Sequence, residues 1–185
     1  MTLAARQLVT AEMLESMPHG EERFELVRGE IISMPPAGGE HGAITMDLAA
    51  VLAIHVKTHK LGRVFAAETG FILRRNPDTV RGADIAFISA ARLETLGELP
   101  KGFCPIVPDL AAETISPNDL YTDTHEKALE WLEAGTRAVI VIDPHKRHVT
   151  VYRSRSNIVV LEGDDILELE DVVPGFRLPV ITIFA

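Results

Sequence analysis

The chain has 185 residues, of which 46% are hydrophobic and 24% charged, as expected for one soluble folded domain spanning residues 1–185. The formal net charge of −9 counts against a broad basic face for nucleic acid, but it leaves room for a local basic rim or a site that holds cations. No apolar run approaches the roughly 20 residues of a membrane span, and a lone Cys104 excludes an internal disulfide and a cysteine metal cluster. Residues 1–7 have no apolar core long enough for a secretory signal, so we expect a cytoplasmic protein without a membrane segment.

The first third of the chain predicts a short helix, a hairpin and a long helix. Thr10 is suited to cap the short helix, because its hydroxyl can accept a hydrogen bond from a backbone amide of the first turn. Two β-like runs, 24–27 and 30–34, flank Arg28-Gly29, and glycine readily adopts the positive φ of a tight hairpin turn. From 40 to 60, apolar residues recur at helical spacing.

The middle of the chain predicts two strands at 64–73 and 82–89, with a turn at 75–78 between them. A short helix at 90–96 and an irregular stretch come before a buried strand at 108–115, which has Glu113 near its middle. A turn rich in Ser, Pro, Asn and Asp leads into a helix over 123–134, which Gly135 is suited to end.

The last third predicts strands and a mixed sheet. Residues 138–142 are all apolar and indicate a central strand, whereas 148–153 alternate as a half-exposed hairpin partner does. These elements predict an α/β or α+β domain, a mixed β-sheet flanked by helices with an N-terminal β-hairpin. The hairpin at 148–153 and the apolar segment 180–184 offer sheet edges or patches that a second copy could cover, so we expect a homodimer.

Two carboxylates in apolar strands are the leading candidates for chemistry. Burying the unpaired carboxylate of Glu113 costs several kcal/mol, so Glu113 needs a partner from elsewhere in the chain. Asp84 lies in an apolar strand, on one face with Ala86 and Ile88. Two carboxylates about 4 Å apart repel by roughly 4 kcal/mol at an effective dielectric of about 20, and a cation between them or one proton relieves this. Such hard oxygen ligands suit Mg²⁺ or Mn²⁺. The alternative is that Asp84 and Glu113 are unrelated and bind nearby backbone amides or arginines.

Three further residues have two interpretations each. Lys127 follows Glu113 on the next helix, where it either orients a metal-bound water and stabilises developing charge or is solvated. Glu25 lies mid-strand and is either another acidic ligand or a salt-bridge partner of Arg23 or Arg28. His41 stands at a predicted helix start, where it faces a polar site or caps the helix at the surface.

A series of short motifs follows in order along nearly the whole chain: Arg23-Phe24-Glu25-Leu26-Val27-Arg28-Gly29-Glu30, Gly38-Gly39-Glu40-His41-Gly42, Glu68-Thr69-Gly70-Phe71, Asp84-Ile85-Ala86-Phe87, Glu113-Thr114-Ile115-Ser116-Pro117, residues 127–135, and Val173-Pro174-Gly175-Phe176. Together they resemble the Uma family of restriction-endonuclease-like proteins, which is assigned to the PD-(D/E)XK nuclease fold.

The resemblance implies that Asp84 is the first acidic metal ligand and Glu113 the second, while Glu25 completes the site from the early hairpin. Ala83 stands where a proline usually precedes the aspartate, and Ile115 stands where the motif's lysine would be. The family is similar to nucleases whose lysine has migrated to the next helix, and Lys127 is the candidate here.

The function that the resemblance implies is a DNA endonuclease that uses Mg²⁺ or Mn²⁺ to hydrolyse phosphodiester bonds. The alternative is a catalytically inactive member of the fold that acts as a binding or regulatory module. The acidic net charge favours the alternative, because affinity for nucleic acid comes largely from neutralising phosphates. The presence of all three polar positions favours the endonuclease.

Overall fold

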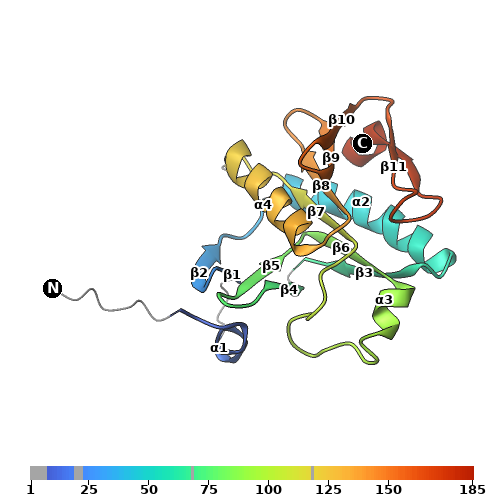
Figure 1. Cartoon of the computed structure of the whole chain (residues 1–185). Helices are drawn as coiled ribbons and strands as arrows, with labels where there is room; N and C mark the ends of the chain where they lie inside the picture. The colour runs from blue at the N-terminus through green and yellow to red at the C-terminus, as the bar shows by residue number, and fades with distance from the viewer. Residues whose placement is uncertain (1–7, 19–22, 68, 118) are drawn as a thin grey trace.

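Two main sheets and four α-helices organise the chain, in a computed structural model that describes residues 8–18, 23–67, 69–117 and 119–185 (Figure 1). The helices are α1 (Ala11–Ser16), α2 (Gly39–Thr58), α3 (Ala90–Glu94), α4 (Tyr121–Ala134) and the 3-10 helix η1 (Val180–Phe184). The larger sheet has the spatial order β10 (Asn157–Glu162), β9 (His148–Ser154), β8 (Ala138–Asp143), β7 (Leu110–Thr114), β6 (Ile85–Ser89) and β3 (Gly62–Ala66). The smaller sheet has the order β2 (Glu30–Met34), β1 (Arg23–Val27), β5 (Thr79–Gly82) and β4 (Gly70–Arg74), and β11 (Ile166–Glu168) pairs with β12 (Arg177–Pro179).

The larger sheet is mixed, as predicted. Strands β7 and β8 run parallel, joined by the crossover helix α4, whereas the other neighbouring strands of this sheet are antiparallel. Strand β8 lies between β7 and β9 and is buried along its whole length, which confirms the central strand expected at 138–142. Gly135 ends α4 with a φ of 112°, a conformation that glycine adopts without strain.

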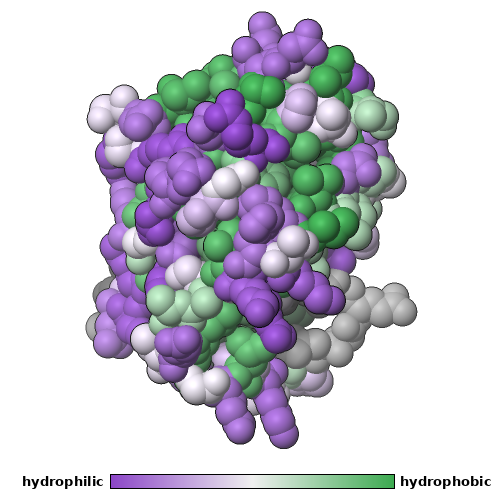
Figure 2. All heavy atoms as spheres, turned by 90° about the vertical axis from the view of Figure 1, so that its right-hand side faces the viewer, coloured by the Kyte–Doolittle hydropathy of each residue, from purple (hydrophilic) through white to green (hydrophobic). Residues whose placement is uncertain are grey.

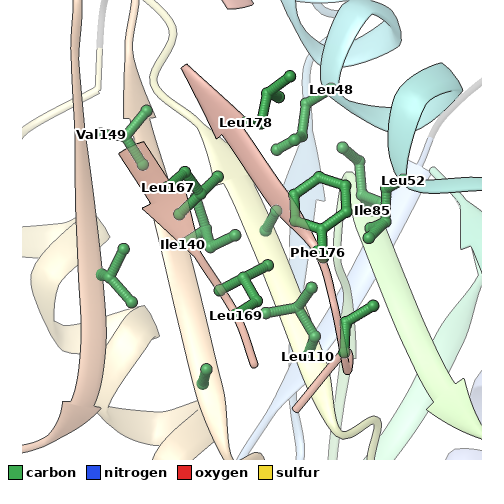
Figure 3. Packing of buried hydrophobic residues seen from close by; sticks show 14 of the residues in the cluster. Leu48, Leu52, Ile85, Leu110, Ile140, Val149, Leu167, Leu169, Phe176 and Leu178 are labelled. Carbon is green, nitrogen blue, oxygen red and sulfur yellow. The ribbon is translucent and has the colours of Figure 1, made fainter. Parts of the chain in front are cut away.

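Helices cover both faces of the larger sheet. On one face, Leu48 and Leu52 of α2 pack with Ile85, Leu110 and Ile140, and residues of the C-terminal segment close the same core (Figure 3). The other core lies on the opposite face of the sheet, where Trp131 and Ala128 of α4 pack against alternate residues of β6, β7 and β8. Glu113 is on this α4 side of β7, because it has the same strand parity as Ala111 of that core.

The predicted strand 64–73 covers parts of two strands, β3 and β4. The predicted strand 82–89 is β6 preceded by the last residue of β5, and the prediction assigned residues 79–81 of β5 to no strand. β3 and β6 belong to the larger sheet, whereas β4 and β5 belong to the smaller one. Asp84 therefore lies not within a strand but in the short link between β5 and β6, where the chain passes from one sheet to the other.

The N-terminal elements follow the prediction closely. The Oγ1 of Thr10 accepts a hydrogen bond from the amide of Met13 and so caps α1. Strands β1 and β2 form the expected hairpin, and Arg28 and Gly29 have φ values of 51° and 81° in its turn. The predicted helix over 123–134 begins two residues earlier, at Tyr121. Glu68 of the Glu68-Thr69-Gly70-Phe71 motif and Asn118 of the predicted turn before α4 lie outside the described residues.

The two segments expected to carry a homodimer are largely buried, although Ile181 of the segment 180–184 is 49% exposed. Strand β9 is internal, between β10 and β8, and its residues from Val149 to Tyr152 are buried rather than half exposed. In the segment 180–184, the side chains of Val180, Ile183 and Phe184 are buried in the core beneath α2 because η1 folds back onto that helix. Within the described ranges, no helix is long and apolar enough to cross a membrane.

Candidate functional site

The four candidate residues come from four different elements. Glu25 is on β1, Asp84 is in the link between β5 and β6, Glu113 is the penultimate residue of β7, and Lys127 is midway along α4. Helix α4 packs on β8 and β9, next to β7, and also contacts β4 of the smaller sheet, while β5 leads into Asp84, so these elements meet where the two sheets adjoin (Figure 1). The structure brings all four residues into one polar cluster.

Lys127 lies at the centre of this cluster. Its Nζ lies 2.9 Å from Glu113 Oε2 and 3.2 Å from Glu25 Oε1, and it donates to the carbonyl oxygen of Gly82 at 3.2 Å. The three N–H groups of the ammonium thus have three acceptors. Burial alone would lower the pKa of Lys127, but the carboxylates of Glu113 and Glu25 raise it above its ordinary value. Lys127 is therefore a fixed positive charge near neutral pH rather than a solvated helix lysine.

Glu113 finds the partners that its burial requires on α4. Besides Lys127, the indole Nε1 of Trp131 donates to Glu113 Oε1 at 2.8 Å. Burial raises the pKa of Glu113 from 4.5 to about 7; nearby Asp84 and Glu25 add to the rise, and Lys127 opposes it. The carboxyl group of Glu113 therefore titrates near neutral pH.

Glu25 is held by residues that sequence reasoning missed. Arg81 of β5 donates from Nη1 to Glu25 Oε2 at 2.7 Å and from Nε to Glu130 Oε2 of α4 at 2.6 Å, while the amide of Gly82 donates to Glu25 Oε1 at 3.0 Å. Burial alone would raise the pKa of Glu25, but Lys127 and Arg81 hold it below its ordinary value. Of the two interpretations of Glu25, the salt bridge is present, but with Arg81 and Lys127. The available signal was Arg81 itself, an arginine between Val80 and Gly82 that must pair if buried.

Asp84 joins the cluster through the residue that follows Glu113. Its Oδ2 accepts a hydrogen bond of 2.8 Å from the amide of Thr114 and lies 3.1 Å from Nε2 of His41, in the first turn of α2. Burial alone would raise the pKa of Asp84, but these two contacts hold it below its ordinary value, and the same contact raises the pKa of His41. Asp84 does bind a backbone amide, as the alternative expected, but that amide fixes it beside Glu113. His41 faces this polar site rather than the bulk solvent.

The comparisons with known proteins identify the family. Residues 11–181 match the model of the Uma2 family, which is described as "putative restriction endonuclease". The chain belongs to the Uma2 family. Among solved structures, it is similar to a protein from Anabaena variabilis described as a putative nuclease belonging to DUF820, with 25% sequence identity and a TM-score of 0.81. The similarity covers 95% of this chain and 97% of that chain. The search of curated proteins found no significant match.

Membership of the Uma2 family and the likeness to this structure confirm the predicted resemblance and the nuclease-like mixed α+β fold, and they support a nuclease. Ile115, which stands where the lysine of the nuclease motif would be, packs into the apolar core beneath α4. Lys127 of α4 instead brings its ammonium to the acidic residue of β7. The reach that a migrated lysine requires is therefore present, and the catalytic role of Lys127 stays a prediction.

The oxygen atoms of the cluster fit a small divalent cation with few protein ligands. Among the residues that the structure describes, no three His, Cys, Asp or Glu side chains form a metal-binding group. Mg²⁺ needs only one or two carboxylates, because it retains water and binds substrate phosphate. The hydrogen bond from Thr114 and the contact with His41 both involve Oδ2 of Asp84, which leaves Oδ1 as the oxygen that could bind a cation. The residues present therefore suit Mg²⁺ or Mn²⁺ and do not form a closed all-protein cage.

Proposed function

We propose that this Uma2 protein is a metal-dependent DNA endonuclease that hydrolyses phosphodiester bonds, with Asp84 and Glu113 holding Mg²⁺ or Mn²⁺. The observation that carries the proposal is the position of Lys127 Nζ, 2.9 Å from Glu113 and 3.2 Å from Glu25, in a family of nuclease type. A bound divalent cation would lower the pKa of a coordinated water and polarise the scissile phosphate. We further propose that the protein acts in the cytoplasm as a homodimer.

The two carboxylates and the ammonium of Lys127 have different roles in this proposal. The two carboxylates supply hard oxygen ligands, and the proton that Glu113 holds below its pKa of about 7 must leave before Glu113 can bind a cation. Lys127, whose pKa is raised by Glu113 and Glu25, remains protonated, so it acts as a fixed cation and not as a general base. Its positive charge would stabilise the negative charge that develops on the phosphate oxygens.

Plasmid cleavage tests this proposal. We expect purified protein to nick or linearise plasmid DNA with Mg²⁺ or Mn²⁺ and to leave it intact with EDTA. Glu113→Gln and Lys127→Met should each lower the rate by a factor of roughly 100 or more, the size of effect seen when one charge-stabilising group is lost. Glu133→Gln is the matched control, because Glu133 is on the same helix but its side chain is 51% exposed and pairs with Arg155. Cleavage that persists in Glu113→Gln would mean that the activity comes from elsewhere.

The net charge of −9 favours a second function, a catalytically inactive module that binds a partner or regulates it. This alternative predicts that Mg²⁺ and Mn²⁺ leave both DNA and the melting temperature of the protein unchanged. The endonuclease predicts a rise in melting temperature, because a ligand that binds only the folded state stabilises it. Metal binding without cleavage would favour a module that has kept its acidic cluster.

A further inference from the structure

Strand β10 is an open edge of the larger sheet. One side of β10 pairs with β9, and no strand among the described residues pairs with its other side (Figure 1). Ile158, Val159 and Val160 are 38%, 44% and 55% exposed. Because neighbouring strand residues point to opposite faces, the apolar side chains of β10 are exposed on both faces of the sheet.

No lysine, proline or central bulge protects the middle of β10. Open edges usually carry a lysine, a proline or a central bulge, which prevents pairing with another chain. The run from Ile158 to Leu161 contains no charge and no proline, and the one irregularity in its pairing with β9 is at Asn157, where the strand begins. The unpaired backbone groups of β10 therefore form a template for one more strand.

The charges at the ends of β10 favour an antiparallel partner of the same sequence. Arg155, whose side chain is 70% exposed and pairs with Glu133 of its own chain, precedes the strand, whereas Glu162, Asp164 and Asp165 end and follow it. Antiparallel pairing of two copies places the basic end of one strand beside the acidic end of the other, and parallel pairing would place like charges together. A second copy of this chain is thus complementary to β10.

We propose that the homodimer forms by antiparallel pairing of β10 with β10 of a second copy. Pairing near the middle of the strand brings Arg155 of each copy next to the turn 163–165 of the other. The two-fold axis stands perpendicular to the sheet, so α4 of both copies lies on the same face of one continuous sheet. This inference rests on the homodimer of the proposed function and adds that both Glu113–Lys127 sites face the same side of the dimer.

The competing surface is the outer face of α2. Apolar side chains reach the surface in patches on the right-hand side of the molecule in Figure 1 (Figure 2), and Met46, Val51 and Ile54 of α2 are 60%, 41% and 67% exposed. The charged residues Asp47 and Lys57 interrupt this helix face, and the backbone groups of α2 are already paired within the helix. Strand β10 offers unpaired backbone groups as well as apolar side chains, which favours it as the interface.

Sedimentation equilibrium of the full chain tests the interface. We expect the wild type to be a dimer, and Val160→Lys to raise its dissociation constant at least about tenfold, with the circular dichroism and the unfolding midpoint of the monomer unchanged. Ile54→Lys on α2 is the matched control, since it places the same charge at another exposed apolar position, and it should remain a dimer.

A charge reversal gives a second test that does not depend on Val160. Arg155→Glu should weaken the dimer, and adding Asp164→Lys should restore it, because the reversed charges again face each other across the two-fold axis. Arg155→Glu also breaks the pair of Arg155 with Glu133 within the chain, so the restoration, and not the loss alone, tests the interface. A monomeric wild type, a dimer that is as tight in Val160→Lys as in the wild type, or dissociation caused by Ile54→Lys would each overturn the interface. A β10 dimer that cleaves no DNA would leave the interface standing and contradict the endonuclease.

Discussion

Lys127 lies between two groups of acidic residues, and the two groups differ in which positive charges neutralise them. On the side of β1 and β5, Glu25 contacts Arg81 and Lys127, and Arg81 continues to Glu130, with every contact at 3.2 Å or less. On the side of β6 and β7, Asp84 contacts a backbone amide and His41, and the histidine is charged only when it is protonated. Permanent cations thus neutralise the first side, whereas Asp84 and Glu113 share Lys127 and a titratable histidine.

This difference separates the framework from the reactive part of the cluster. Arg81 joins β1, β5 and α4 through two carboxylates, so it fixes the position of the helix that carries Lys127. At Asp84 and Glu113 the consequence is the opposite. Burial, and to a smaller extent the charge of Asp84, raises the pKa of Glu113, and the two carboxylates would favour an added cation. The first side should therefore determine folding stability, and the second should determine the response to metal and pH.

Removing Arg81 is the strongest test of the framework. Arg81→Met leaves Glu25 and Glu130 without their shared partner, and we expect a loss of about 3–5 kcal/mol in the free energy of unfolding measured with urea, as for a broken buried ion pair. The double variant Arg81→Met with Glu25→Gln should recover part of this loss. Arg177→Met is the control, because the exposed pair of Arg177 with Glu168 is worth only about 0–1 kcal/mol. Equal losses in Arg81→Met and Arg177→Met would show that the two sides do not differ.

The pH dependence of stability should come from the side of β6 and β7, which carries Asp84 and Glu113. Because the pKa of Glu113 rises from 4.5 to about 7 on folding, its contribution to stability is present at acid pH and is lost as the pH increases from 4.5 through 7. Glu113→Gln should flatten this part of the curve of unfolding free energy against pH. In the wild type, Mg²⁺ or Mn²⁺ should raise the melting temperature more above pH 7 than below it, because protons compete with the metal for Glu113.

His41 titrates in the same direction, since its pKa is also raised, so the comparison needs a second variant. The pH dependence of the unfolding free energy that remains in His41→Gln is then the part that Glu113 contributes. A metal effect that is the same on both sides of pH 7 would contradict the assignment of Glu113 as a ligand.

The sequence predicts the reactive side better than the framework. Glu113 was recognisable because a carboxylate within an apolar strand demands a partner, and the family resemblance indicated Lys127 and Asp84. The partners of Arg81 were not recognisable, because its contact with Glu130 spans 49 positions and its contact with Glu25 spans 56. The prediction also merged β3 with β4 and missed most of β5, since a run of strand-forming residues does not say which sheet it joins. The open edge was misplaced for the same reason, because sequence periodicity does not give the order of strands.

The smallest effect on stability should come from replacing His41. This variant tests whether the imidazole is needed for the metal response of Asp84 and Glu113. His41→Gln removes the imidazole from Asp84 Oδ2 but keeps the amide of Thr114, 2.8 Å from the same atom. We expect a loss of about 1 kcal/mol in the free energy of unfolding, the worth of one ordinary hydrogen bond, and an unchanged rise in melting temperature with Mg²⁺. Asp84→Asn should behave differently, because it removes a charged ligand and should abolish the metal response. If His41→Gln abolishes that response as well, the imidazole is a required part of the metal site, and the amide of Thr114 alone does not hold Asp84 in place.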